Sequence, residues 1–240
     1  MTIAYDTIAP SYARHRGGYA FAVAILNRLY GKSPGGPVLE VGCGTGVYAA
    51  AMAEAGARTV YAMDLSHQML RQAPEHDRIA YLQGRATDLP FADHALDMIF
   101  SVNVVHHIQN IDDYMRESFR ILEPGGVFCT ATDSEAIIRR RTPLSRYWPA
   151  TVPVELERYH DLEMLRGKMA ALGFCDIDEC EGSMSFPISD VEAYREKAFS
   201  CLQLISEDAF APGLQAMESD LHAGSLHGTS ELAFLWAKRP

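Results

Sequence analysis

Residues 38–46 read Val38-Leu39-Glu40-Val41-Gly42-Cys43-Gly44-Thr45-Gly46, an apolar strand with one embedded acid that runs into a loop with glycine at every second position. Glycine has no Cβ, so alternate glycines let the backbone adopt turn conformations that other residues resist and approach a ligand closely. A second acid, Asp64, ends the next apolar run, Val60-Tyr61-Ala62-Met63. In an α/β nucleotide-binding fold, an acid about 20 residues beyond the glycines binds a ribose. The two features together predict a cofactor loop.

The spacing of the glycines disfavours a phosphate ligand. A dinucleotide-binding turn reads G-x-G-x-x-G and presents a helix N-terminus to the pyrophosphate, whereas this loop reads G-x-G-x-G. A P-loop requires a lysine followed by serine or threonine after its glycines, and Val47-Tyr48 stands there instead. Neither phosphate-binding motif is therefore present.

Four ordered blocks resemble the class I S-adenosylmethionine-dependent methyltransferases, in particular the group of small-molecule enzymes that includes those of ubiquinone and menaquinone biosynthesis. The blocks are residues 40–46, Asp64, residues 84–91 and residues 97–108, and Leu122-Glu123-Pro124-Gly125-Gly126 follows them. The resemblance is close over residues 1–132 and holds only in outline beyond. It implies S-adenosyl-L-methionine as the cofactor.

In this family, the residue matched by Glu40 receives the ammonium group of the cofactor, the one matched by Asp64 binds the ribose and the one matched by Asp88 binds the adenine amino group. A plainer interpretation stays open for each: Glu40 bonds backbone amides, Asp64 caps a helix, and Asp88 is an ordinary turn aspartate. The residues expected at the cofactor are Tyr12, Arg16, Glu40, Gly42, Cys43, Gly44, Thr45, Gly46, Asp64, Leu65, Met69, Thr87, Asp88, Leu89, Ser101, Val102 and His106.

Residues 5–16 resemble the N-terminal segment that folds over the cofactor in many relatives. Tyr12 and Arg16 are then expected to close the site, because a guanidinium fits the cofactor carboxylate well. The alternative is an amphipathic helix that packs Tyr12 in the core and leaves Arg16 in solvent.

Methyl transfer from a sulfonium is an in-line displacement, so the site must mainly hold donor and acceptor collinear and away from water. A general base is needed only when the acceptor loses a proton. Adjacent positions at a helix start point in different directions, so at most one of His106 and His107 is expected to face the methyl group. By the family pattern, His106 is the candidate nearer the cofactor and His107 is structural. Asp133 and Glu135 are alternative acids at the acceptor site, and no catalytic residue is assigned.

The acceptor side carries two further patterns. Arg139-Arg140-Arg141 either binds a carboxylate or phosphate of the substrate or forms a solvated face. An apolar acceptor pocket would draw on a set of large side chains, of which most are expected to be ordinary core: Met164, Met169, Phe174, Met184, Phe186, Tyr194 and Phe199.

Alternating strand and helix patterns predict an α/β fold: a Rossmann-like, mostly parallel sheet with helices on both faces. The resemblance implies seven strands, of which the last two form an antiparallel hairpin. Strands are expected near residues 38–41, 59–63, 79–82, 96–101, 127–131, 174–181 and 231–237. Helices are expected near residues 10–31, 47–55, 66–73, 112–121 and 160–172, and Ser189-Asp190-Val191-Glu192 predicts a capping box that opens a helix to about residue 206.

At 240 residues with 48% hydrophobic content, the chain is long enough to bury a full core. We expect a single methyltransferase domain over residues 1–240. It divides into an N-terminal helical cap at 1–36, a cofactor-binding core at 37–132 and substrate-side insertions at 133–173 and 182–228.

Composition narrows the partners. A net charge of -10 disfavours a nucleic-acid substrate, which usually meets a basic face. The five cysteines form no C-x-x-C pair and are odd in number, so reduced thiols in the cytoplasm are expected and no metal is implied. Neither a leader peptide nor an apolar run long enough to cross a membrane is indicated.

The sequence thus predicts a cytoplasmic methyltransferase that acts on a small-molecule acceptor and releases S-adenosylhomocysteine. Two alternatives stay open: a methyltransferase-like protein that uses the same cofactor for altered chemistry, and a cofactor-binding protein with a non-catalytic regulatory role. A nicotinamide-dependent oxidoreductase would require nicotinamide binding, which we expect to be absent.

Overall fold

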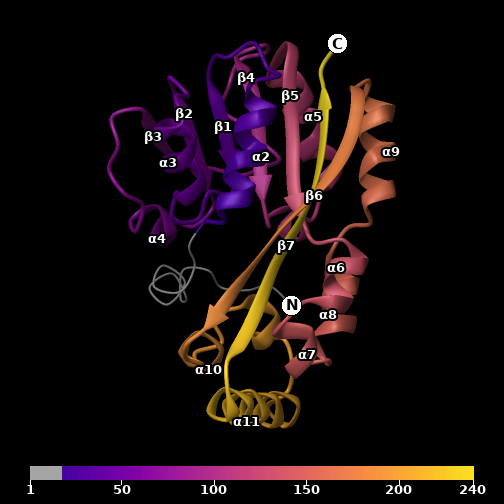
Figure 1. Cartoon of the computed structure of the whole chain (residues 1–240). Helices are drawn as coiled ribbons and strands as arrows, with labels where there is room; N and C mark the ends of the chain where they lie inside the picture. The colour runs from indigo at the N-terminus through magenta and orange to yellow at the C-terminus, as the bar shows by residue number, and fades with distance from the viewer. Residues whose placement is uncertain (1–17) are drawn as a thin grey trace.

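The computed structural model describes residues 18–240 as a seven-stranded sheet with helices on both faces and a helical extension below it (Figure 1). The strand order is β3-β2-β1-β4-β5-β7-β6, and the β1–β5 neighbours run parallel, whereas β7 is antiparallel to both β5 and β6. The predicted fold class is confirmed. The strands are β1 (Val38–Val41), β2 (Val60–Asp64), β3 (Ile79–Gln83), β4 (Leu96–Val102), β5 (Leu122–Thr132), β6 (Cys175–Ile188) and β7 (Leu226–Lys238).

Each central strand buries both of its faces. In β1, Val38 belongs to the core beneath one helical layer, and its neighbour Leu39 belongs to the core on the other side. This arrangement explains the nearly continuous apolar runs of the parallel strands. One layer contains α2 (Ala20–Tyr30) and α3 (Val47–Glu54), and the other contains α5 (Ile111–Ile121) and α9 (Leu162–Leu172). The short α4 (His67–Leu70) follows β2.

The strand order reverses between β1 and β4, which lie side by side although β2 and β3 separate them in the sequence. In such sheets, ligands bind beyond the carboxyl ends of the strands at this reversal. The glycine loop leaves β1 at this point, and residues 103–107 leave β4 there. The topology therefore brings the first and last of the predicted sequence blocks together.

The C-terminal hairpin is much longer than expected. Its register runs without interruption from Asp178↔Trp236 to Ile188↔Leu226, so β6 and β7 extend beyond the parallel sheet (Figure 1). The predicted strand at 174–181 ended too early because residues 181–185 are mostly small or polar, which is a weak strand signal. The expected insertion at 182–228 thus begins inside β6 and ends inside β7.

Helices surround the extended half of this hairpin, and several of them share a separate core with it. Trp148 lies at the centre of this core, where its indole stacks on Tyr194 and on Phe210 with ring centroids 5.7 Å and 5.9 Å away. We call this part of the chain the cap. Its elements are α6 (Glu135–Arg140), α7 (Leu144–Tyr147), α8 (Thr151–Arg158), α10 (Glu192–Arg195), the 3-10 turn η2 (Ser200–Gln203) and α11 (Glu207–Ala223).

The predicted capping box at residues 189–192 is wrong. The residue that precedes α10 is Val191, which makes no side-chain cap, and Asp190 instead accepts a hydrogen bond from the backbone N–H of Glu192. The helix ends at Arg195, far short of residue 206. The helix N-cap residue in this region is Ser206, whose hydroxyl accepts from the backbone N–H of Ala209 at the start of α11.

Among residues 18–240, no helix has both the length and the apolar character that a membrane crossing requires. The same residues contain no group of three or more side chains arranged to hold a metal ion.

Candidate functional site

The loop after β1 adopts backbone conformations that favour glycine. The φ angles of Gly42, Gly44 and Gly46 are 71°, 54° and 75°, in the left-handed region that side chains rarely adopt. A Cβ on Gly42 would also lie 2.4 Å from the side chain of Val104. These glycines are required by the turn itself and by its close approach to the segment after β4.

Glu40 lies near the end of β1 and is 1% exposed. It accepts a hydrogen bond from the backbone N–H of Ala49, one of the amides left free in the first turn of α3. Its second oxygen, Oε2, has no hydrogen-bond partner among the described residues. Burial raises the pKa of this carboxyl well above its ordinary value, and the nearby charge of Asp64 adds to the effect. A buried carboxyl oxygen without a partner is suited to a ligand cation.

Asp64 ends β2 and supports the glycine loop directly. Its Oδ2 accepts from the backbone N–H of Gly44 at 2.8 Å, and its Oδ1 accepts from the backbone N–H of Ser66 at 2.8 Å. Each carboxylate oxygen can accept more than one hydrogen bond, so a ligand hydroxyl can donate to the same carboxylate. The helix-capping alternative does not apply, because Ser66 rather than Asp64 caps α4.

Three residues expected at the adenosine end of the cofactor lie near the protein surface. Leu65 is 62% exposed beside Asp64. Asp88 is exposed and sits in a turn in which its backbone N–H donates to the carbonyl of Arg85. Thr87 is half-buried in the same turn. The turn-aspartate interpretation of Asp88 and its role toward the adenine are therefore compatible with each other.

Three further residues expected at the cofactor are buried. Leu89 and Met69 are each 2% exposed. Ser101 is fully buried in β4, where its hydroxyl bonds Thr130. Because neighbouring protein atoms cover these side chains, their direct contact with the cofactor stays a prediction.

A small cavity of about 50 Å³ lies against the glycine loop. Its wall contains six of the residues expected at the cofactor: Glu40, Gly42, Cys43, Gly44, Thr45 and Val102. Four further residues complete the wall and were not predicted: Tyr19, Val47, Tyr48 and Asn103. Tyr12 and Arg16 lie outside the described residues. The first described residues do reach this place, because the backbone N–H of Tyr19 donates to the Tyr48 hydroxyl.

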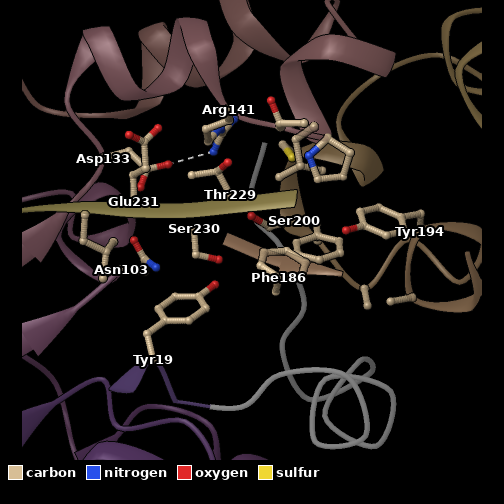
Figure 2. Close-up of a pocket in the computed structure, with 18 of the residues that line it drawn as sticks. Tyr19, Asn103, Asp133, Arg141, Phe186, Tyr194, Ser200, Thr229, Ser230 and Glu231 are labelled. Carbon is tan, nitrogen blue, oxygen red and sulfur yellow. Dashed lines mark hydrogen bonds and ion pairs between the residues drawn. The ribbon is translucent and has the colours of Figure 1, made fainter. Parts of the chain in front are cut away.

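A larger cavity of about 480 Å³ lies between the sheet and the cap (Figure 2). Its wall includes His106, His107, Asp133 and Arg141 together with residues of the extended hairpin. Tyr19 and Asn103 line both cavities, so the two meet at these side chains. Asn103 has a left-handed φ of 57°, and its Oδ1 is buried without a hydrogen-bond partner in the described part of the chain.

Both histidines after β4 line the larger cavity. The His106 ring stacks on Tyr159 with centroids 3.9 Å apart, and burial lowers the pKa of His106 well below its ordinary value, with His107 and Arg158 adding to the effect. Burial and Arg158 lower the pKa of His107 to about 4. Both imidazoles are therefore neutral near pH 7. The expected division between a cofactor-side His106 and a structural His107 stays a prediction.

Arg139, Arg140 and Arg141 form ion pairs with different partners. Arg139 forms an exposed ion pair with Glu135, so both side chains lie on a solvated face. Arg140 pairs with Glu181 and Glu231 of the extended hairpin. Only Arg141 turns inward to the larger cavity, where Asp133 and Glu155 are its partners.

The large side chains predicted for an apolar acceptor pocket lie in two different places. Met184, Phe186, Tyr194 and Phe199 line the larger cavity. Met169 of α9 and Phe174 are buried in the core between α9 and the sheet, with Met164 of α9 packed against that core.

Comparison with known proteins identifies a domain within the chain. Residues 39–130 match the model of a methyltransferase domain. The chain is 36% identical to a malonyl-[acyl-carrier protein] O-methyltransferase from Serratia marcescens over 55% of this chain and 56% of that protein. It is 27% identical to a demethylmenaquinone methyltransferase from Lysinibacillus sphaericus over 62% of this chain and 69% of that protein. The chain thus spans little more than half the length of the Serratia relative.

Among solved structures, phosphoethanolamine N-methyltransferase 2 from Haemonchus contortus aligns with a TM-score of 0.66 at 23% identity, over 99% of this chain and 58% of that one. Identity this low supports the fold alone. The fold, the glycine loop with its two acids and the matched domain model agree with one another. Residues 39–130 therefore form a methyltransferase domain, and the chain resembles the class I S-adenosylmethionine-dependent methyltransferases.

Proposed function

We propose that this protein transfers a methyl group from S-adenosylmethionine to a small-molecule acceptor held in the larger cavity. The observation that carries the proposal is the meeting of two cavities at Tyr19 and Asn103. One of them carries the glycine loop, and the other has a volume typical of a small-ligand site. An in-line displacement requires the methyl donor and the acceptor atom to face each other, as they would where the two cavities meet.

The residues of the smaller cavity fit the cofactor. Glu40 offers a buried, unpartnered oxygen for the ammonium group, and no described residue competes for it. Asp64 offers acceptor capacity to the ribose, and the exposed Leu65 beside it offers an apolar surface to the adenine. Asp88, which lies in an exposed turn, is proposed to accept from the adenine amino group. The cofactor itself supplies the electrophilic methyl group.

The larger cavity offers positioning rather than strong base catalysis. His106 and His107 stay neutral in this setting because their pKa values are lowered, and a base with a low pKa removes protons poorly from weak acids. The proposed acceptor atom is therefore one that is nucleophilic without help from a strong base. The Asn103 amide, at the junction, would orient it.

We also propose that the reaction takes place in the cytoplasm and involves no nucleic acid. No disulfide forms within residues 18–240, which contain all five cysteines, as expected for a reducing compartment. The net charge of -10 disfavours a polyanionic substrate.

Two measurements test the proposal. Calorimetry with S-adenosylmethionine and with nicotinamide dinucleotides tests the cofactor site, and binding of the first alone is expected. Release of S-adenosylhomocysteine in the presence of a panel of small acceptors then tests turnover. Cofactor binding without turnover on any acceptor would favour the non-catalytic regulatory role, and nicotinamide binding would overturn the proposal.

A further inference from the structure

A chain of alternating buried charges forms one wall of the larger cavity. The Arg141 Nη1 lies 2.8 Å from the Asp133 Oδ2 and 3.1 Å from the Glu155 Oε2, and Glu155 in turn pairs with Arg158. The four side chains are at most 16% exposed. Two guanidinium groups thus balance two carboxylates, so the group carries no net charge. Figure 2 shows Asp133 and Arg141 together at one end of the cavity.

One edge of the Arg141 guanidinium takes no part in these ion pairs. Its Nη1 makes both ion contacts, whereas Nε and Nη2 are buried and find no acceptor within residues 18–240. In Arg120, the same two nitrogens have acceptors, because Nε and Nη2 each donate to an oxygen of Glu117 at 2.8 Å. Buried donors without partners are costly. Two such donors on a residue of the cavity wall therefore indicate that a ligand supplies the acceptor atom.

The other end of the cavity is aromatic. Phe186, Tyr194 and Phe199 line it, and the rings of Tyr194 and Phe199 stack with centroids 5.0 Å apart and an interplanar angle of 17°. Trp148 stacks on Tyr194 from behind and fixes its orientation. Phe199 and Trp148 cover the Tyr194 ring, so the half-buried rings of Phe186 and Phe199 are the aromatic surfaces left to a ligand. Such surfaces favour a flat, conjugated ligand, which gains stacking without losing conformational freedom.

The charge balance decides between an anionic and a neutral ligand. Four carboxylates belong to the cavity wall, those of Asp133, Glu155, Asp190 and Glu231, and the only lysine or arginine in the described wall is Arg141. Arg140 and Arg158 neutralise Glu231 and Glu155 from outside the cavity. A further buried anion would therefore lack a counter-charge of its own among residues 18–240.

We propose that the acceptor is a planar conjugated compound whose uncharged carbonyl oxygen accepts hydrogen bonds from Nε and Nη2 of Arg141. The ring system lies against Phe186 and Phe199. The carbonyl directs the neighbouring part of the molecule toward Asn103 and the cofactor. This inference rests on the proposed function for the use of the larger cavity as the acceptor site.

The test uses three small probes that share a benzene ring: acetophenone, benzoate and ethylbenzene. They offer a neutral carbonyl, a carboxylate and no oxygen. Binding of S-adenosylhomocysteine is first verified by calorimetry, so that a failed cofactor site is recognised separately. Dissociation constants of the probes are then measured by saturation-transfer NMR on the protein saturated with S-adenosylhomocysteine. Acetophenone is expected to bind at least about tenfold more tightly than ethylbenzene, and more tightly than benzoate.

The variant Arg141→Lys keeps a cation for Asp133 and Glu155 but loses the two-donor edge. It is expected to bind acetophenone no better than ethylbenzene while its affinity for ethylbenzene is unchanged. Arg139→Lys, on the solvated face, is the matched control and should retain the wild-type preference. Equal binding of acetophenone and ethylbenzene by the wild type, tighter binding of benzoate, or an equal loss for all probes in Arg141→Lys would each overturn the proposal. The wild-type comparison remains decisive if Arg141→Lys does not fold.

Discussion

Replacing Glu40 with glutamine should stabilise the protein without cofactor and weaken its cofactor binding. Glu40 is 1% exposed, and its Oε2 has no partner in the described part of the chain, so ionising it in the folded state is unfavourable. Its pKa is raised above the ordinary value of 4.5. Between that value and the folded pKa, the folded state binds more protons than the unfolded state, so stability falls as pH rises. Glutamine cannot ionise, so it removes this pH-dependent penalty, and its side-chain oxygen can still accept from the backbone N–H of Ala49.

The first magnitude follows from the cost of ionising a buried carboxyl, which glutamine does not pay. Each unit by which burial raises the pKa corresponds to about 1.4 kcal/mol, and each kcal/mol to a change in Tm of roughly 2–4 °C for a chain of this size. Loss of the charge-assisted bond to the cofactor ammonium costs about 1.5–3 kcal/mol, or roughly 10- to 150-fold in Kd. The two effects have opposite signs, which a general loss of folding cannot imitate.

Scanning calorimetry between pH 5 and 8, a range chosen to lie above about 4.5, measures the first effect, and titration calorimetry with S-adenosylmethionine measures the second. The wild-type Tm should decline relative to Glu40→Gln as pH rises. Glu54→Gln, at the exposed end of α3, serves as the control and should change neither quantity. A variant that binds the cofactor as well as the wild type would refute the role of Glu40, and a lower Tm at pH 8 would refute the burial argument.

Three further substitutions probe other parts of the site. Asp64→Ala should weaken cofactor binding by roughly 1–3 kcal/mol in titration calorimetry, whereas the exposed Asp77→Ala should not. Arg141→Met leaves two buried carboxylates without their shared partner and should lower the free energy of unfolding by about 3–5 kcal/mol in urea melts, against a small change for Arg139→Met. The lowered pKa of His106 means that stability falls as pH drops below about 6.5, so the Tm of His106→Gln should depend less on pH in that range.

The cofactor half of the protein was predictable because its signals are local. The glycine spacing of the β1 loop and the acid at the end of β2 each lie within a short stretch, and together they are typical of a nucleotide-binding fold. The apolar runs of β1 and β4 are buried on both faces, which makes these strands easy to recognise. The residues that complete the smaller cavity were missed: Tyr19 and Asn103 carry no motif and are brought there only by the tertiary fold.

The part of the chain after residue 132 was poorly predicted because its elements depend on distant contacts. Strand β6 is polar and largely exposed, and pairing with β7 alone holds it as a strand. Helix α11 contains Pro212 followed by Gly213, a pair that usually indicates a turn. The glycine is required because a Cβ there would lie 2.4 Å from the Trp148 indole nitrogen. Arg139, Arg140 and Arg141 look alike in sequence and are distinguished only by their partners.

A crystal structure of the protein soaked with S-adenosylhomocysteine would test the central claim most directly. The adenosyl group should lie along the glycine loop with its amino acid portion at Glu40, and the sulfur should face the 480 Å³ cavity between Tyr19 and Asn103. A thioether that points away from that cavity, or a glycine loop that holds a phosphorylated compound instead, would contradict the proposed function.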